Sequence, residues 1–309
     1  MSGDDEDQSR SLLNLVRSLP KAELHLHIEG TLEPELMIEI AKRNGLLDSL
    51  SFHDANAARQ AYLFKNLQGF LNIYYQGCNV LQHEQDFFDL TSAYLERAAV
   101  EGVIWAEIMF DPQAHTQRGV AFEAVVKGIS RALTAASNSL GIHGCLIMNF
   151  MRDLGADAAQ KMLDEALPFK HLITAVGLDS AEIGWPPSQF KAVYARAAHE
   201  GFKLVAHAGE EGPPDNIWAA VKDLRVSRID HGIRCLEDEK LIHHLRDTQI
   251  PLTVCPISNE KLKVYEGQLS QKLRQLLTCN LVITLNADDP AYFGGYENVM
   301  AHPLQQSYC

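Results

Sequence analysis

The sequence predicts a (β/α)8 barrel of the TIM type, folded as a single α/β domain. Eight short apolar runs alternate with segments in which apolar residues recur at helical spacing, which is typical of parallel strands joined by helices. Eight such units indicate a closed barrel, and 309 residues are sufficient for one. An open doubly wound sheet is the alternative, but it would be expected to have a glycine-rich turn after an early strand.

The first predicted strand, residues 21–30, has side chains that alternate with a period of two. Its apolar residues fall on one face, and the opposite face carries Glu23, His25, His27 and Glu29. The two histidines therefore point the same way and could bind one metal ion. A His-x-His motif alone is weak evidence for a metal, so the later strands have to support it.

The other seven strands are predicted from apolar runs at residues 102–110, 142–150, 173–178, 202–207, 228–231, 250–255 and 281–286. The clearest helical spacing between them lies at residues 87–100, 122–140 and 191–200. Residues 44–86 are rich in aromatic side chains, most of which we expect in the core and a few over an active site. Residues 1–10 are predicted to be a disordered acidic tail, and the barrel domain is predicted to span residues 11–309.

Composition limits the class of protein. The net charge of −13 argues against a nucleic-acid partner, because phosphate backbones select basic surfaces. Six scattered cysteines, none in a Cys-x-x-Cys pair, favour a reducing compartment over a disulfide framework. Neither a signal segment nor a membrane-spanning run is predicted. We therefore expect a cytoplasmic protein, with the nucleus left open as a second location, and the sequence also leaves its oligomeric state open.

Reactive side chains follow several of the predicted strands, at the end where barrel enzymes carry their chemistry. The fifth strand ends in His207 and is followed by Glu210, the sixth ends in His231, and the eighth is followed by Asp288 and Asp289. Each residue could have a purely structural role, such as a buried histidine or a helix cap before a proline. Their occurrence together at successive strand ends favours a functional site.

The inward faces of these strands are predicted to bring His25, His27, His207 and Asp288 together. Three neutral imidazoles and one carboxylate are a ligand set that suits Zn²⁺ and leaves a position for water. One zinc ion per chain is therefore expected.

The ordered set His-x-His, His-Ala-Gly-Glu, Asp-His-Gly and Asp-Asp-Pro resembles the adenosine/adenine deaminase family of the amidohydrolase superfamily, over residues 20–298. Four passages resemble its adenine deaminase branch, at residues 23–34, 179–182, 255–259 and 288–296. The resemblance implies that zinc is bound by the four residues named above. It also implies that Glu210 is the proton donor, that His231 orients and deprotonates the attacking water, and that Asp289 contacts the substrate.

The activity that this resemblance implies is hydrolytic deamination of adenine to hypoxanthine and ammonia, in purine salvage. The Pro-Cys-x-x-Cys motif of cytidine-type deaminases is absent, so their combination of His-x-Glu with Pro-Cys-x-x-Cys does not occur, which excludes that fold. Glu29 and Glu182 replace an aspartate and a glycine of the adenosine-cleaving relatives. Glu29 is one methylene longer than the aspartate and would project into the space that a sugar needs. Glu182 would accept a hydrogen bond from the N–H of a free base and would be left unpaired by a nucleoside. The alternative is that both glutamates are paired elsewhere and only line the pocket.

Two alternatives stay open. One is an adenosine deaminase. The other is a non-catalytic, truncated remnant, because the family pattern continues past Tyr296 with further helices, whereas this sequence ends with residues 297–309. The last helices of the barrel are therefore expected to be missing.

Overall fold

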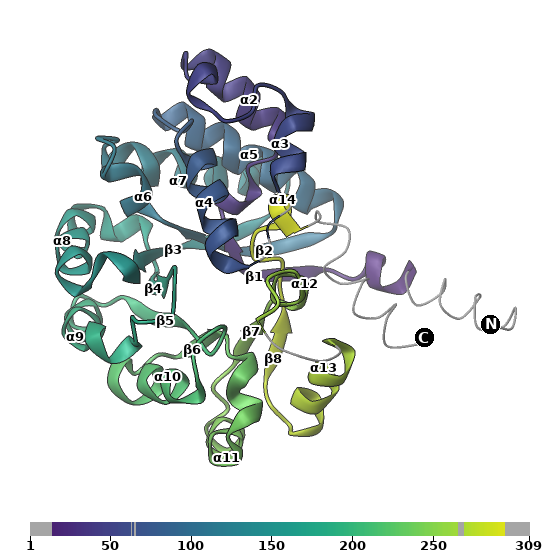
Figure 1. Cartoon of the computed structure of the whole chain (residues 1–309), viewed down its shortest axis with the longest axis vertical. Coiled ribbons are helices and arrows are strands. Elements are labelled where there is room, and N and C mark those ends of the chain that lie inside the picture. The colour runs from purple at the N-terminus through teal and green to yellow at the C-terminus, as the bar shows by residue number, and fades with distance from the viewer. Residues whose placement is uncertain (1–13, 63, 65, 265–268, 294–309) are drawn as a thin grey trace, which may run out of the picture.

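A computed structural model describes residues 14–62, 64, 66–264 and 269–293. It confirms the predicted fold class: eight parallel strands lie in the order β1 to β8 and form a nearly closed barrel (Figure 1). The strands are β1 (Lys21–His27), β2 (Val103–Phe110), β3 (His143–Met151), β4 (Ala175–Asp179), β5 (Lys203–Ala208), β6 (Arg228–His231), β7 (Leu252–Val254) and β8 (Ile283–Leu285). The last two strands are shorter than predicted. The predicted acidic tail and the ending after Tyr296 lie outside the described residues.

Helices alternate with the strands and surround them (Figure 1). They are α2 (Pro34–Arg43), α3 (Ala55–Ala61), α4 (Leu67–Cys78), α5 (Glu84–Val100), α6 (Pro112–Thr116), α7 (Phe122–Ser139), α8 (Ala156–Ala166), α9 (Lys191–His199), α10 (Pro214–Ala219), α11 (Glu239–Thr248), α12 (Pro256–Lys261), α13 (Leu269–Thr278) and α14 (Pro290–Phe293). The predicted helical segments correspond closely to α5, α7 and α9. Within the described residues, no helix is long and apolar enough to span a bilayer.

The barrel is closed between β1 and β8 by a few specific hydrogen bonds. The His27 amide donates to the Asp288 carbonyl at 3.0 Å, and the Asp288 amide donates to the His25 carbonyl at 3.1 Å. Lower in the seam, the side-chain oxygen of Asn286 accepts from the Leu24 amide at 3.1 Å. The closing bonds therefore fix Asp288 directly beside the two histidines of β1.

A small apolar layer fills the barrel interior and consists of Met109, Ile147, Ala175 and Val205. Val205 and His207 lie two residues apart on β5, so they point to the same side of the strand. His207 consequently points into the barrel above an apolar floor, as the alternation of β5 predicts.

A separate apolar cluster, formed mainly by α4 and α14, includes Phe70, Tyr74, Tyr292 and Phe293. Several side chains of α4, from the segment predicted to contain both core and covering aromatics, line the cavity described below. This part of the prediction is confirmed, because these side chains cover the mouth of the barrel.

Candidate active site

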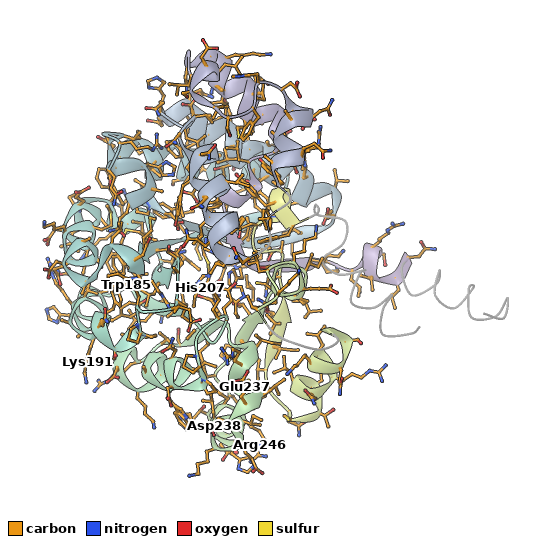
Figure 2. The ribbon with its side chains drawn as sticks, viewed as in Figure 1. Trp185, Lys191, His207, Glu237, Asp238 and Arg246 are labelled. Carbon is orange, nitrogen blue, oxygen red and sulfur yellow. The ribbon has the colours of Figure 1, made fainter. Side chains whose placement is uncertain are left out.

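The four predicted ligands converge at the carboxyl ends of the strands. His25 Nε2 lies 3.3 Å from Asp288 Oδ1, and His27 Nε2 lies 3.6 Å from the same oxygen. His27 Nε2 also lies 3.1 Å from His207 Nε2. All four residues are buried, and Figure 2 shows His207 near the centre of the molecule.

These separations suit a small divalent cation. Tetrahedral ligands about 2.0–2.1 Å from zinc lie roughly 3.3 Å from one another, close to the distances above. Burial lowers the pKa of His27 and that of His207, which favours the neutral imidazoles that bind metals. Burial disfavours the charge of Asp288, but the adjacent His231 and β1 histidines lower its pKa below the usual range. The ligand atoms of His25, His207, His231 and Asp288 all lie within 4.8 Å of one another, so this group could hold a metal ion. His27 adjoins the group through His207 and Asp288 and also lies close to Asp111 and Asp179.

Neighbouring side chains orient the imidazoles. The Thr253 hydroxyl donates to Asp230 Oδ1 at 2.9 Å, so at its 2.9 Å contact with His25 Nδ1 it accepts the ring N–H. This arrangement leaves the lone pair of His25 Nε2 free to bind a metal. The Nδ1 atom of His27 lies 3.6 Å from Asp179 Oδ2, on the side of the ring away from the other ligands.

Glu210 and His231 lie next to this group. His231 Nε2 is 3.7 Å from Glu210 Oε2 and 3.8 Å from Asp288 Oδ2, and its Nδ1 contacts Asn259 Nδ2 at 3.2 Å. Burial raises the pKa of Glu210 well above its usual value, with the charge of Asp288 adding to the effect. Burial lowers the pKa of His231 to about 4. Burial thus favours the protonated form of the Glu210 carboxyl group and the neutral form of the His231 imidazole.

Asp289 completes the cluster and is packed tightly against the loop after β1. A Cβ on Gly30 would lie 2.0 Å from Asp289 Oδ1 and 2.7 Å from the Asp289 Cα, so only glycine fits there. Burial raises the pKa of Asp289 well above its usual value, and the charge of Asp288 adds to this. The Oδ1 atom of Asp289 has no hydrogen-bond partner among the described residues.

Apart from His25, which does not line it, these groups face one cavity with a volume of about 400 Å³. Its polar lining is His27, Asp111, Asp179, Ser180, His207, Glu210, His231, Asp288 and Asp289, and its apolar lining includes Leu67, Phe70, Leu71 and Leu262. Asp111, Asp179 and Ser180 were not predicted from the sequence as site residues. The signal was present, because Asp111 follows β2, Asp179 ends β4, and Ser180 comes next.

Glu29 and Glu182 are placed differently from what the sequence predicted. Glu182 accepts hydrogen bonds from four successive backbone amides of residues 209–212, at 2.8–3.1 Å, and from the Asn216 side chain at 2.8 Å. Glu29 accepts from the Asp111 amide at 3.1 Å and contacts His115 Nε2 at 2.9 Å. Among the described residues that line the cavity, neither glutamate appears. Both carboxylates hold the loops of the site instead of facing the cavity.

The barrel and its buried His/Asp group define a hydrolase of the amidohydrolase type. The chain belongs to the adenosine deaminase family, whose sequence model matches residues 20–305. It is 55% identical to an adenine deaminase of Chlorobium phaeobacteroides over 292 residues, which cover 94% of this chain and 87% of that protein. It is 54% identical to an adenine deaminase of Pseudomonas putida, with coverage of 94% and 91%.

Solved structures agree with this assignment. The crystal structure of adenine deaminase from Arthrobacter aurescens superimposes with a TM-score of 0.89 at 49% identity, covering 93% of this chain and 88% of that one. An amidohydrolase from Burkholderia ambifaria, solved with bound zinc, gives a TM-score of 0.84 at 25% identity, with coverage of 96% and 85%.

Proposed function

We propose that this chain is an adenine aminohydrolase, which converts adenine and water to hypoxanthine and ammonia. The observation that carries the proposal is the placement of Glu210 and His231 next to each other and beside Asp288 in one cavity, where burial favours a protonated carboxyl group and a neutral imidazole. Deamination of an aromatic amine needs both an acid for the ring nitrogen and a base for the water. The named relatives, which are adenine deaminases, support adenine as the substrate.

One zinc ion, bound by His25, His27, His207 and Asp288, is part of this proposal. The ligand distances and the bound zinc of the Burkholderia relative support it. Such an ion acts as a Lewis acid and makes water a better nucleophile at neutral pH.

The protein side chains move the protons. As placed, Asn259 Nδ2 donates to His231 Nδ1; when the amide turns by 180°, its oxygen, which has no other partner among the described residues, accepts the Nδ1–H of His231. The Nε2 lone pair then faces the cavity and can take a proton from the attacking water. As water adds at C6, the Glu210 carboxyl donates its proton to N1, which neutralises the charge that collects there. His231 then gives its proton to the amine, ammonia leaves, and the hydroxyl proton of the adduct restores Glu210.

The remaining predicted residues position the reacting groups. A protonated Asp289 can donate to N7 of the purine, a role that its raised pKa and unpaired Oδ1 support. Glu182 holds the loop that carries Glu210, and Glu29 holds the start of the loop after β2. In this proposal the two glutamates act through other residues and do not touch the substrate.

The test is the ultraviolet spectrum of adenine incubated with purified, metal-loaded protein, with adenosine in parallel. Adenosine deaminase activity is the second candidate, because the family also carries that name. We expect kcat/KM for adenine to exceed that for adenosine by at least about 100-fold. A site that accepts a hydrogen bond from a substrate N–H rejects an analogue without that N–H by this factor or more. Equal values, or a preference for adenosine, would contradict the proposal.

A further inference from the structure

Two aspartates form a wall of the cavity that the steps above leave unused. Asp111 follows β2 and Asp179 ends β4, and both are only 3% exposed. Asp111 stands at the cap position of α6, yet its side chain makes no capping hydrogen bond and lines the cavity instead. Among the described residues, neither Asp111 Oδ1 nor Asp179 Oδ1 accepts a hydrogen bond from a fixed donor.

The other oxygen of each carboxyl group is held by the protein. Tyr74 donates to Asp111 Oδ2 at 3.3 Å, and Asn149 donates to Asp179 Oδ2 at 2.7 Å. The Asp111 amide is fixed by Glu29 at 3.1 Å. The two carboxyl groups also interact directly with each other. The structure therefore holds the pair rigidly and leaves acceptor capacity at the cavity.

This pair and the catalytic acid stand in different parts of the cavity. Glu210 lies 3.7 Å from His231, whereas Asp179 and Asp111 lie 3.6 and 3.9 Å from His27 Nδ1. In a purine, N1 and C6 lie at the opposite end of the ring system from N9. A base whose N1 faces Glu210 consequently directs its N9 edge away from the catalytic acid.

We propose that Asp111, supported by Asp179, accepts a hydrogen bond from the imidazole-edge N–H of the purine and so selects free bases over N9-substituted purines. The inference rests on the proposed function and assigns the selectivity that the sequence attributed to Glu29 and Glu182. An N9 substituent has no proton to donate, so a buried acceptor is left unpaired, which costs binding. The substituent also meets the Tyr74 and Tyr75 side chains that line the cavity.

The test compares adenine with 9-methyladenine, which differs at N9 by one methyl group. The wild-type protein should favour adenine in kcat/KM by at least about tenfold, the loss expected for one unpaired buried acceptor. Asp111→Asn keeps the shape of the side chain but presents an amide. We expect this variant to reduce the preference for adenine over 9-methyladenine at least about tenfold, mainly because kcat/KM for adenine falls, while the metal content stays unchanged. The matched control, Asp153→Asn, changes a carboxylate absent from the described cavity lining and should keep the wild-type preference.

Binding of purine and 9-methylpurine, which have no leaving amine, gives a readout separate from catalysis. Wild-type protein should bind purine more tightly, and this holds as a test even if Asp111→Asn does not fold. An unchanged preference in Asp111→Asn, or a variant that only loses metal, would show that the pair merely supports His27 and would overturn the proposal. Equal use of adenine and 9-methyladenine by the wild type would also overturn it but leave the proposed function standing. Failure to deaminate adenine would contradict the proposed function alone.

Discussion

At the scale of single residues, the site depends on backbone conformations that L-amino acids rarely adopt. His231 and Asp288 have φ angles of 61° and 63°, in the left-handed region. His231 ends β6 and Asp288 lies three residues after the end of β8, and an extended backbone at either place would point the side chain elsewhere. Strain of this kind persists only where the surrounding structure imposes it, and it is common at active sites.

The first prediction concerns the metal ligands. His27→Ala and Asp288→Ala should each remove most of the bound metal and the activity, because each deletes one of four converging ligand atoms. Metal analysis should find about one divalent ion per wild-type chain. His243→Ala, a change on α11 away from the site, is the control. Full metal content in either ligand variant would show that the ligand set is wrong.

The second prediction separates chemistry from metal binding. Glu210→Gln keeps the shape of the side chain but removes its acidic proton, so kcat should fall by roughly 100-fold or more while the metal is retained. Steady-state kinetics and metal analysis on one preparation measure both effects. Glu211→Gln changes the adjacent carboxylate and should have a much smaller effect. The reverse order of effects would identify Glu211 as the proton donor.

At the scale of elements, one carboxylate organises the loop after β5. The Glu182 carboxylate accepts hydrogen bonds from all four backbone amides of residues 209–212. A glutamine here would have an NH2 group in place of one oxygen, and that group would face N–H donors and find no acceptor. The third prediction is that Glu182→Gln lowers kcat at least about tenfold, because Glu210 sits on this loop and its placement affects the rate. Glu165→Gln, on the exposed side of α8, is the control. Wild-type kinetics in Glu182→Gln would show that these bonds do not position Glu210.

The turn after β1 presses against the turn after β8. A methyl group at Gly30 would meet backbone as well as side-chain atoms of Asp289, so neither can move aside easily. The fourth prediction is that Gly30→Ala displaces Asp289 and lowers kcat/KM for adenine by about tenfold or more. Gly69→Ala is a suitable control, since its added methyl meets only side-chain atoms, at 3.3 Å or more. Equal kinetics in the two variants would show that the contact is unimportant.

At the scale of the whole molecule, the barrel closes through side chains as well as backbone. Asn286 accepts from the Leu24 amide at 3.1 Å and donates to the Thr284 hydroxyl at 2.9 Å. The fifth prediction is that Asn286→Ala lowers the free energy of unfolding by about 1–3 kcal/mol, the cost of unpaired buried groups. Denaturant titration measures it, with the exposed Asn138→Ala as the control. An unchanged midpoint would show that backbone bonds alone hold the seam.

Sequence periodicity was sufficient to predict the fold and the convergence of the buried histidines. Alternation along β1 and β5 placed His25, His27 and His207 on inward faces, because strand geometry is local. The position of Asp288 was predicted correctly for an incorrect reason. The prediction continued the alternation of β8 to that residue, but the strand ends at Leu285, and a left-handed residue beside β1 brings the carboxylate inward.

The sequence by itself determined that reactive side chains gather at one end of a barrel, since strand order and alternation are written in local patterns. Only the tertiary structure decided which acids face the cavity. Glu182 is bound by amides 27 to 30 residues away, and Glu29 is bound by groups from β2 and α6. Asp111 and Asp179 keep acceptor capacity at the cavity because their fixed donors reach one oxygen each. Partners so distant along the chain leave no local sequence pattern. Which acidic side chains face the cavity is therefore determined by the hydrogen bonds of the folded molecule.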